Sequence, residues 1–223
     1  KAFLKQLQIQ TQMLKAKFRI DLRVRAIASS KKMILDDAGL DLSKWESKWS
    51  AASVETPDLQ KLAAHIRASH LPHAVLIDCT ASEAIARHYE PWLAQGIHVI
   101  TPNKLAGSAS SESWQRIKSV AKKHHAHIFY EATVGAGLPV LSTLKDLVQT
   151  GDQIESIQGV LSGTLGYLFS QVQAGKLFSE ALKEARVQGF TEPDPRDDLS
   201  GQDVARKILI LAREAGIELE LAD

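Results

Sequence analysis

The sequence T-E-P-D-P-R-D-D-L-S-G-Q-D-V-A-R-K, from Thr191 to Lys207, joins an irregular acidic segment to the start of a helix. Two prolines each fix their own φ and disfavour the helical region for the residue before them, so residues 192–198 cannot be regular structure. Apolar residues then recur at steps of three and four, which predicts a helix from Leu199 to Glu214. Asp198 occupies the predicted N-cap, where its carboxylate suits the positive end of the helix dipole.

The same segment places an acid and an amine on one helical face. Asp203 and Lys207 are four residues apart, so their side chains lie one turn above each other. Such a pair is usually a solvated surface contact that contributes about 0.2–0.5 kcal/mol. Stability does not require so many acids and prolines close to one amine, however. The combination, with Glu192 and Asp198 in the bend, favours a binding or catalytic site.

Upstream of this segment, short apolar runs alternate with amphipathic helical patterns. The predicted strands are Asp21–Ser29, Ala74–Thr80, His98–Thr101, Ala126–Tyr130 and, with an ambiguous pattern, Ile154–Leu161. The predicted helices are Ala2–Lys17, Pro57–Ser69, a helix capped by Ser82 and ended by Gly96, Ser110–His124, Pro139–Gln149, a helix after Ser162-Gly163-Thr164, and Phe178–Gln188. Strands and helices in alternation with short links predict a parallel, doubly wound sheet with right-handed crossovers.

This alternation gives way to helices with one strand-like segment near residue 139. The fold class is therefore α/β. We expect a partial Rossmann-type parallel sheet domain over residues 1–138. An α+β substrate-binding and dimerisation domain should follow over residues 139–223.

Composition is that of an ordinary globular protein. The chain has 223 residues, a formal net charge of +1 and 44% hydrophobic residues, enough to bury a sizeable core. No apolar run approaches the ~20 residues of a membrane span, and the charge balance argues against a nucleic-acid binder. Cys79 is the single cysteine, which excludes internal disulfides and fits a reducing compartment. We expect a cytoplasmic protein that contacts neither membrane nor nucleic acid.

Four segments closely resemble homoserine dehydrogenases in sequence, order and spacing. They are Gly189–Lys207, T-P-N-K (Thr101–Lys104), E-A-T-V-G-A-G-L-P (Glu131–Pro139) and L-S-G-T-L-G-Y (Leu161–Tyr167). The resemblance extends from about the first helix to the end of the chain. The segment Lys17–Met33 is most similar to the dehydrogenase half of bifunctional aspartokinase–homoserine dehydrogenases, which implies fusion to an upstream aspartokinase.

The resemblance implies an oxidoreductase of the aspartate pathway, in threonine, methionine and isoleucine biosynthesis. It would interconvert L-homoserine and L-aspartate 4-semialdehyde by hydride transfer with a nicotinamide cofactor, as a homo-oligomer, most simply a dimer. Reducing the aldehyde puts negative charge on its oxygen, which needs a proton donor in reach. The resemblance offers Lys207 and Lys104. We favour Lys207 because Asp203 can position its ammonium, with Lys104 polarising the same oxygen.

The amino-acid substrate needs acceptors for its ammonium and donors for its carboxylate. By resemblance, Glu192 and Asp203 serve the ammonium or the alcohol, and Asp198 completes the polar wall. Backbone N–H groups at a helix start suit a carboxylate, which assigns Gly163 and Thr164 to that group.

The segment S-S-K-K (Ser29–Lys32) follows a predicted strand without an acid. Positive charge at this point of a dinucleotide fold favours a ribose 2′-phosphate over a free 2′-hydroxyl. The segment therefore predicts NADP(H) over NAD, against the alternative of two solvated lysines. The residues assigned to the cofactor are Ala28, Ser29, Lys32, Thr80, Asn103 and Lys104. The resemblance places Thr80 against the nicotinamide ribose and Lys104 near the reacting end.

The glycine-punctuated loop after Tyr130 has relaxed φ limits, so consecutive carbonyls can turn toward one point. Hard cations take several oxygen ligands. The resemblance implies a monovalent cation, sodium, held by backbone carbonyls. The ligands it assigns are Glu131, Val134, Ala136 and Leu138. The alternative is a hinge without an ion.

Two alternative functions remain open, an inactive module and a semialdehyde dehydrogenase. The first strand and glycine-rich turn of a dinucleotide unit are absent from this sequence, and Lys1 opens directly in a helical pattern. We therefore expect a fragment that also lacks the family's C-terminal end, and the alternative function is an inactive dimerisation or regulatory module. A semialdehyde dehydrogenase would need a cysteine nucleophile, and Cys79, inside a strand predicted to be buried, is poorly placed for that role.

Overall fold

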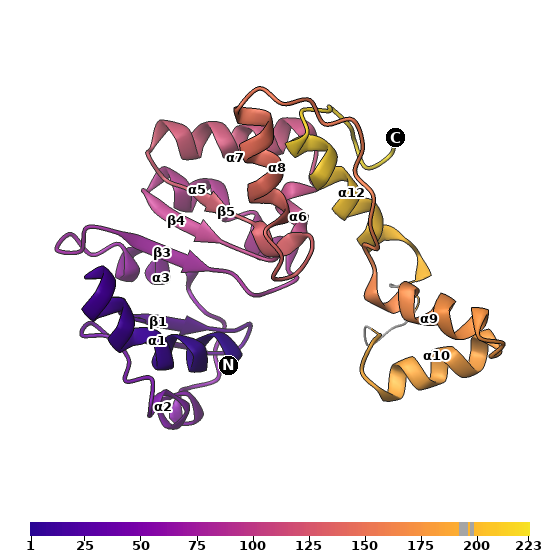
Figure 1. Cartoon of the computed structure of the whole chain (residues 1–223). Coiled ribbons are helices and arrows are strands. Elements are labelled where there is room, and N and C mark those ends of the chain that lie inside the picture. Colours follow the sequence, from indigo (N-terminus) through magenta and orange to yellow (C-terminus); the bar gives the residue numbers. More distant parts are fainter. Residues whose placement is uncertain (192–195, 197–198) are drawn as a thin grey trace. The chain divides into compact units, whose positions relative to one another are not determined.

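The computed structural model describes residues 1–191, 196 and 199–223. These residues form two units, Lys1–Val75 and Leu76–Asp223 (Figure 1). Among the described residues, no helix has both the length and the apolar character needed to cross a membrane.

The first unit opens with helix α1 (Ala2–Phe18), as predicted, and continues into an antiparallel hairpin. The strands of this hairpin are β1 (Ala26–Ala28) and β2 (Met33–Leu35). Helices α2 (Trp45–Ala51) and α3 (Leu59–Ile66) follow. Asp58 caps α3 by accepting hydrogen bonds from two backbone N–H groups of its first turn.

The predicted strand Asp21–Ser29 is wrong in length, because only residues 26–28 form β1. The chain reverses directly after it: the Ser29 N–H donates to the Lys32 carbonyl at 2.8 Å. The Ser29 hydroxyl oxygen also accepts from the N–H groups of Lys31 and Lys32, each at 3.2 Å. The S-S-K-K segment is thus a hairpin turn, and β1 pairs with β2 in the antiparallel direction.

In the second unit, the described residues form a sheet of strand order β3-β4-β5. The strands are β3 (Ala74–Ile77), whose first two residues belong to the first unit, β4 (Ile97–Ile100) and β5 (Ile128–Phe129). Strands β4 and β5 are parallel, with Val99 opposite Ile128. Helices α4 (Glu83–Ala86) and α5 (Tyr89–Ala94) connect β3 to β4, and α6 (Lys104–Gly107) and α7 (Ser111–Lys123) connect β4 to β5. The α/β class and the parallel sheet are confirmed.

Strand β3 is shorter and less buried than predicted. Val75 and Ile77 are exposed, while Ala74 is buried. After Ile77 the Asp78 carboxylate accepts a hydrogen bond from the Thr80 N–H at 2.7 Å, which turns the chain out of the strand. Cys79 is consequently exposed, so its predicted burial is wrong.

A buried polar network joins the ends of β3 and β4. Asp78, Thr101 and Asn103 are almost fully buried, and Tyr89 is 0% exposed. The Tyr89 hydroxyl donates to Asp78 Oδ2 at 2.5 Å and lies 2.8 Å from Thr101 Oγ1. Burial, and then the contact with Asp78, raise the pKa of the Tyr89 phenol far above its usual range. The phenol therefore stays protonated and acts as a donor.

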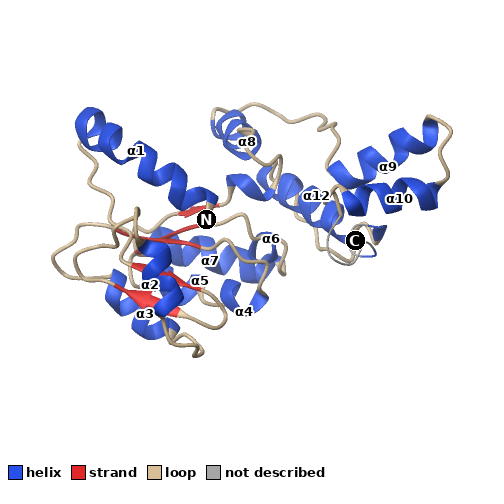
Figure 2. Ribbon diagram, turned by 90° about the horizontal axis from the view of Figure 1, so that it is seen from below, coloured by secondary structure: helices blue, strands red, loops and turns tan. Residues whose placement is uncertain are grey.

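The other regular elements of the second unit, in the part that the structure describes, are helices. Its helices are α8 (Val140–Gln149), α9 (Gly163–Gln173), α10 (Phe178–Val187) and α12 (Gln202–Glu214). Helices α9 and α10 lie side by side (Figure 2), packed around Leu168, Ala181 and Ala185. Residues 131–133 add a short 3-10 turn before α8.

Two predictions fail in this helical region. Residues 154–161 form no strand, because no backbone ladder bond joins them to another strand within the described part of the chain. Helix α12 begins at Gln202 instead of Leu199. Gly201 has a left-handed φ of 73°, so the helix cannot continue from Leu199 through Gly201 into Gln202. The predicted cap Asp198 lies outside the described residues.

We predict that Tyr89→Phe destabilises the fold by about 1–3 kcal/mol, because a buried carboxylate loses a donor. Urea denaturation measures this change in the free energy of unfolding. The matched control is Tyr167→Phe, whose half-buried hydroxyl lies 3.3 Å from Glu184 and should cost less than about 0.5 kcal/mol. Equal effects of the two substitutions would contradict a special role of the Asp78 network.

Candidate active site

One carboxylate contacts two lysines that come from different elements. Lys207, one helical turn beyond Asp203 on α12, places its Nζ 2.6 Å from Asp203 Oδ2. Lys104, the first residue of α6, places its Nζ 3.3 Å from Asp203 Oδ1. The lysine side chains are 18% and 27% exposed, and that of Asp203 is 43% exposed. The structure thus brings together the three residues that the sequence assigns to catalysis.

Lys104 owes its place to a capped helix start. The Asn103 side-chain oxygen accepts from the Leu105 N–H at 3.1 Å, which makes Asn103 the N-cap of α6. Its amide donates to Asp78 Oδ2 at 3.2 Å and to the Ser82 carbonyl at 3.0 Å. Both amide donors are therefore occupied, and the buried Asp78 network fixes the point from which Lys104 projects.

Lys207 makes a second contact, to the L-S-G-T-L-G-Y motif. Its ammonium donates to the Leu161 carbonyl at 2.7 Å. A lysine ammonium has three N–H donors and no acceptor. With two of these donors occupied by Asp203 and Leu161, the direction of the third is set. A reacting oxygen that approaches along that direction would meet a proton donor in a fixed orientation.

The charge state of Asp203 follows from its neighbours. Burial opposes ionisation of this carboxyl, but the hydrogen bond from Lys207 and the charge of Lys104 outweigh it and hold the pKa of Asp203 below its usual range. Asp203 is therefore ionised at neutral pH. Its negative charge offsets the repulsion between the two ammonium groups.

Of the predicted carboxylate ligands, Gly163 is exposed at the start of α9, and Thr164 is buried. The Ser162 hydroxyl oxygen caps this helix by accepting from the Leu165 N–H at 3.1 Å. The Thr164 hydroxyl donates to the Phe190 carbonyl at 2.6 Å, so it ties α9 to the segment after α10. Glu192 and Asp198, the other predicted substrate ligands, lie outside the described residues.

The predicted cofactor residues of the first unit lie on the β1–β2 hairpin. Ala28 ends β1, and Ser29 starts the turn. The Lys32 ammonium donates to the carbonyls of Trp49 at 3.3 Å and Ser50 at 3.5 Å, near the end of α2. A cation here also suits the negative end of a helix dipole.

In the second unit, Thr80 lies three residues after Ile77, the last residue of β3. Its hydroxyl oxygen accepts from the Ser82 N–H at 3.1 Å. Thr80 and Asn103 thus lie just beyond the ends of β3 and β4, and both are ordered by local hydrogen bonds.

The predicted cation loop is bent by two left-handed residues, Gly135 with φ 76° and Ala136 with φ 53°. The Glu131 carboxylate accepts from two N–H groups at the start of α8, each at 2.8 Å. The Leu138 carbonyl accepts from the Val140 N–H at 2.9 Å. A carbonyl has two lone pairs, so the Leu138 oxygen keeps one lone pair beyond this hydrogen bond. No cluster of His, Cys, Asp or Glu suited to a metal occurs in the described part of the chain.

Sequence reasoning missed two buried charged residues that support this site, Asp78 and Arg213. Asp78 interrupts the apolar run A-V-L-I-D-C-T, and that interruption was an available signal. Arg213, in the last turn of α12, has a side chain that is 5% exposed. Nothing in the local pattern distinguishes it from a solvated arginine.

We predict that Lys207→Met raises the pKa of Asp203, because the variant removes the strongest interaction that favours its charged form. Wild-type Asp203 has a lowered folded-state pKa. Its ion pairs therefore stabilise the fold above the unfolded-state pKa, and this stability is lost as the pH falls through the folded-state pKa. Carboxyl-detected NMR titration gives the value in each protein.

The control for this titration is Lys183→Met, which removes an exposed lysine of α10. It should leave the Asp203 titration unchanged. An unshifted Asp203 in Lys207→Met would show that the two side chains are not coupled.

Comparisons with known proteins identify the family. The family model of the homoserine dehydrogenase NAD binding domain matches residues 1–131, and that of homoserine dehydrogenase matches residues 139–223. A bifunctional aspartokinase/homoserine dehydrogenase 2, chloroplastic, from Arabidopsis thaliana is 52% identical over 221 residues, which are 99% of this chain and 24% of that protein. The chain thus spans about a quarter of the length of this curated relative.

Solved structures of proteins named homoserine dehydrogenase share the fold of this chain. A putative homoserine dehydrogenase from Archaeoglobus fulgidus has a TM-score of 0.81 at 26% identity, covering 99% of this chain and 66% of that one. A hyperthermophilic archaeal homoserine dehydrogenase in complex with NADPH has a TM-score of 0.76 at 26% identity, covering 93% and 66%. With family models matching both parts of the chain and one of them more than half of it, this chain belongs to the homoserine dehydrogenase family.

Proposed function

We propose that the protein interconverts L-homoserine and L-aspartate 4-semialdehyde by hydride transfer with NADP(H). One observation carries the proposal: Asp203 holds the ammonium groups of Lys207 and Lys104 together, at 2.6 and 3.3 Å. Two oriented cations beside one carboxylate suit an oxygen that gains negative charge and a proton as an aldehyde is reduced.

In this mechanism Lys207 is the acid–base group. Its ammonium gives a proton to the aldehyde oxygen during reduction, and its amine takes the proton back during homoserine oxidation. Lys104 donates a hydrogen bond to the same oxygen and polarises it. The nicotinamide, when bound, supplies or accepts the hydride. Asp203 keeps both ammonium groups directed at one point.

The substrate's amino-acid end needs separate recognition. We assign Glu192 and Asp203 to its ammonium or to the alcohol end, with Asp198 in the surrounding polar wall. Its carboxylate is assigned to the N–H groups of Gly163 and Thr164 at the start of α9. The bond from Lys207 to the Leu161 carbonyl, two residues before Gly163, supports this assignment because it ties this motif to the reacting end.

We assign NADP(H) over NAD on the charge of the β1–β2 turn. Lys31 and Lys32 provide two cations there and no acid, and Ala28, Ser29 and Lys32 would face the 2′-phosphate. Thr80, Asn103 and Lys104 serve the nicotinamide end. Asn103 would contribute its backbone carbonyl, because its side-chain amide donors and its backbone N–H are occupied. The NADPH complex of the archaeal structural relative supports this choice.

We also propose a sodium ion in the loop after β5, held by the carbonyls of Glu131, Val134, Ala136 and Leu138. Consecutive left-handed residues at Gly135 and Ala136 turn neighbouring carbonyls away from a regular pattern. The cation would fix the link between the sheet and α8.

The remaining proposals concern the whole protein. We place the boundary between a nucleotide-binding part, residues 1–138, and a substrate-binding and dimerisation part, residues 139–223. Fusion to an upstream aspartokinase is proposed from the name of the Arabidopsis relative. A homo-oligomer is proposed from the family resemblance alone. That relative is named chloroplastic. For this protein we propose the cytoplasm, on the free thiol of Cys79.

The test of the function is an NADPH oxidation assay of the intact protein with L-aspartate 4-semialdehyde. We predict turnover with NADPH, and a loss of at least about 100-fold in kcat for Lys207→Ala with little change in KM, because the variant lacks the general acid. Lys183→Ala is the control and should match the wild type. A wild type without turnover would favour the dimerisation or regulatory module. Near-normal turnover of Lys207→Ala would remove Lys207 from its role.

A second substitution tests substrate recognition. We predict that Glu192→Gln raises KM for homoserine far more than it lowers kcat, because the loss of the charge weakens binding of the ammonium in ground and transition states alike. Steady-state kinetics of homoserine oxidation separate the two constants. Glu155→Gln, an exposed glutamate elsewhere in the chain, is the control. A fall in kcat at unchanged KM would assign Glu192 to the chemical step instead.

A further inference from the structure

The guanidinium of Arg213 is nearly completely buried and fully hydrogen-bonded. Its side chain is 5% exposed, and a guanidinium has five N–H donors in a fixed plane. NH1 donates to the carbonyls of Gly107 at 2.9 Å and Ala109 at 2.7 Å. Nε and NH2 donate to the Leu219 carbonyl at 3.3 and 3.0 Å, and NH2 also to Glu220 at 3.2 Å.

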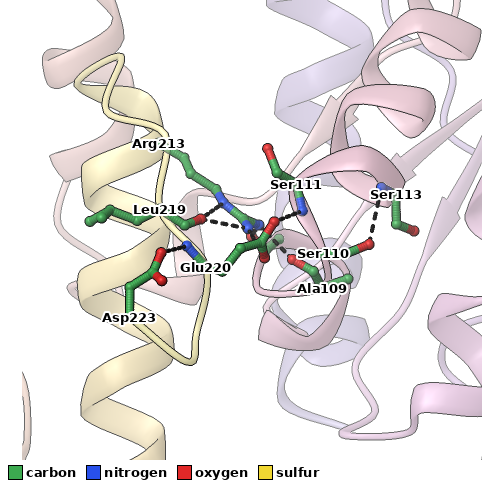
Figure 3. A network of polar contacts seen from close by, with 9 residues as sticks. Ala109, Ser110, Ser111, Ser113, Arg213, Leu219, Glu220 and Asp223 are labelled. Carbon is green, nitrogen blue, oxygen red and sulfur yellow. Dashed lines mark hydrogen bonds and ion pairs between the residues drawn. The ribbon is translucent and has the colours of Figure 1, made fainter.

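These acceptors belong to separate parts of the chain. Gly107 ends α6, and Ala109 lies in the link between α6 and α7, whereas Leu219 and Glu220 follow α12. Figure 3 shows Arg213 and Glu220 between these segments. Glu220 extends the network, because its carboxylate accepts from the N–H of Ser111, the first residue of α7, at 2.7 Å.

Helix α6 is thus joined to α12 at both of its ends. At its start, Lys104 contacts Asp203 at 3.3 Å. At its end, the Gly107 carbonyl accepts from Arg213. Between these contacts the helices approach closely, since a Cβ added to Gly107 would lie 3.3 Å from Cγ1 of the buried Ile210.

We propose that Arg213 is a positioning residue that aims Lys104 at Asp203 and the reacting oxygen. Helix α6 has only the four residues Lys104–Gly107, and a single turn has little stability of its own. Its direction therefore depends on what holds its C-terminal carbonyls. Arg213 holds them, so it acts on the chemistry through Lys104 and without touching the substrate. The proposal rests on the catalytic function proposed above.

The first test replaces the guanidinium in the intact protein. Arg213→Met keeps most of the side-chain length and removes all five donors. We expect kcat to fall by about 100-fold, as for a misplacement of about 1 Å, with KM changed less than about threefold. Arg213→Lys keeps the charge and should give an intermediate loss, because one ammonium cannot reach all of these acceptors.

The deciding test is a double-mutant cycle with Lys104→Met. If Arg213 acts through Lys104, Arg213→Met should lower kcat less than about threefold once Lys104 is absent. A purely structural role would instead give the same fold loss in both backgrounds, and that result would overturn the proposal. Arg116→Met, which removes a half-exposed arginine paired with Glu90, is the control and should leave kcat unchanged in both backgrounds.

The pKa of Asp203 can be measured without any enzyme turnover, so it tests the role of Arg213 independently of the proposed function. Loss of the Lys104 contact should raise the pKa of Asp203 in Arg213→Met, and this rise should be absent in the Lys104→Met background. NMR titration measures it even if the wild type reduces no aldehyde. Should Arg213→Met fail to fold, Arg213→Lys enters the same cycle and titration. Equal shifts in both backgrounds would then overturn the positioning role.

Discussion

The carboxylate of Asp203, shared between the ammonium groups of Lys207 and Lys104, is the interaction on which the site depends. Two ammonium groups so close to one point would repel each other. The carboxylate between them attracts both and offsets that repulsion. The contact distances of 2.6 and 3.3 Å show that both attractions are made. Because Lys104 and Lys207 belong to α6 and α12, the same carboxylate also joins two elements that are about a hundred residues apart in sequence.

Two buried networks support this interaction from opposite ends of α6. Asp78 and Tyr89 fix Asn103, which caps the start of the helix. Arg213 binds the carbonyl at its end. Because α6 is held at both ends, the position of its charged first residue, Lys104, is fixed. Charged residues far from the reacting atoms can in this way set the direction of a catalytic side chain.

Much of the fold could be predicted from the sequence, because periodicity reports burial on one face. It located α1, α7 and α10 and the pair Asp203–Lys207 on α12. The proximity of Lys104 to that pair came from family resemblance alone, since no local pattern encodes a tertiary contact. The hairpin at β1 and the coil at residues 154–161 were missed, because pairing decides whether an extended segment is a strand. Buried Arg213 was missed for the same reason: its acceptors come from other segments.

The most direct test of whether Asp203 directs both lysines at the reacting oxygen is a crystal structure of the intact protein with NADP and L-homoserine bound. We predict that the homoserine hydroxyl lies within hydrogen-bond distance of the nitrogens of both Lys207 and Lys104, with Asp203 still between them. A hydroxyl bound away from both lysines, or Asp203 turned from Lys104 in the complex, would contradict it.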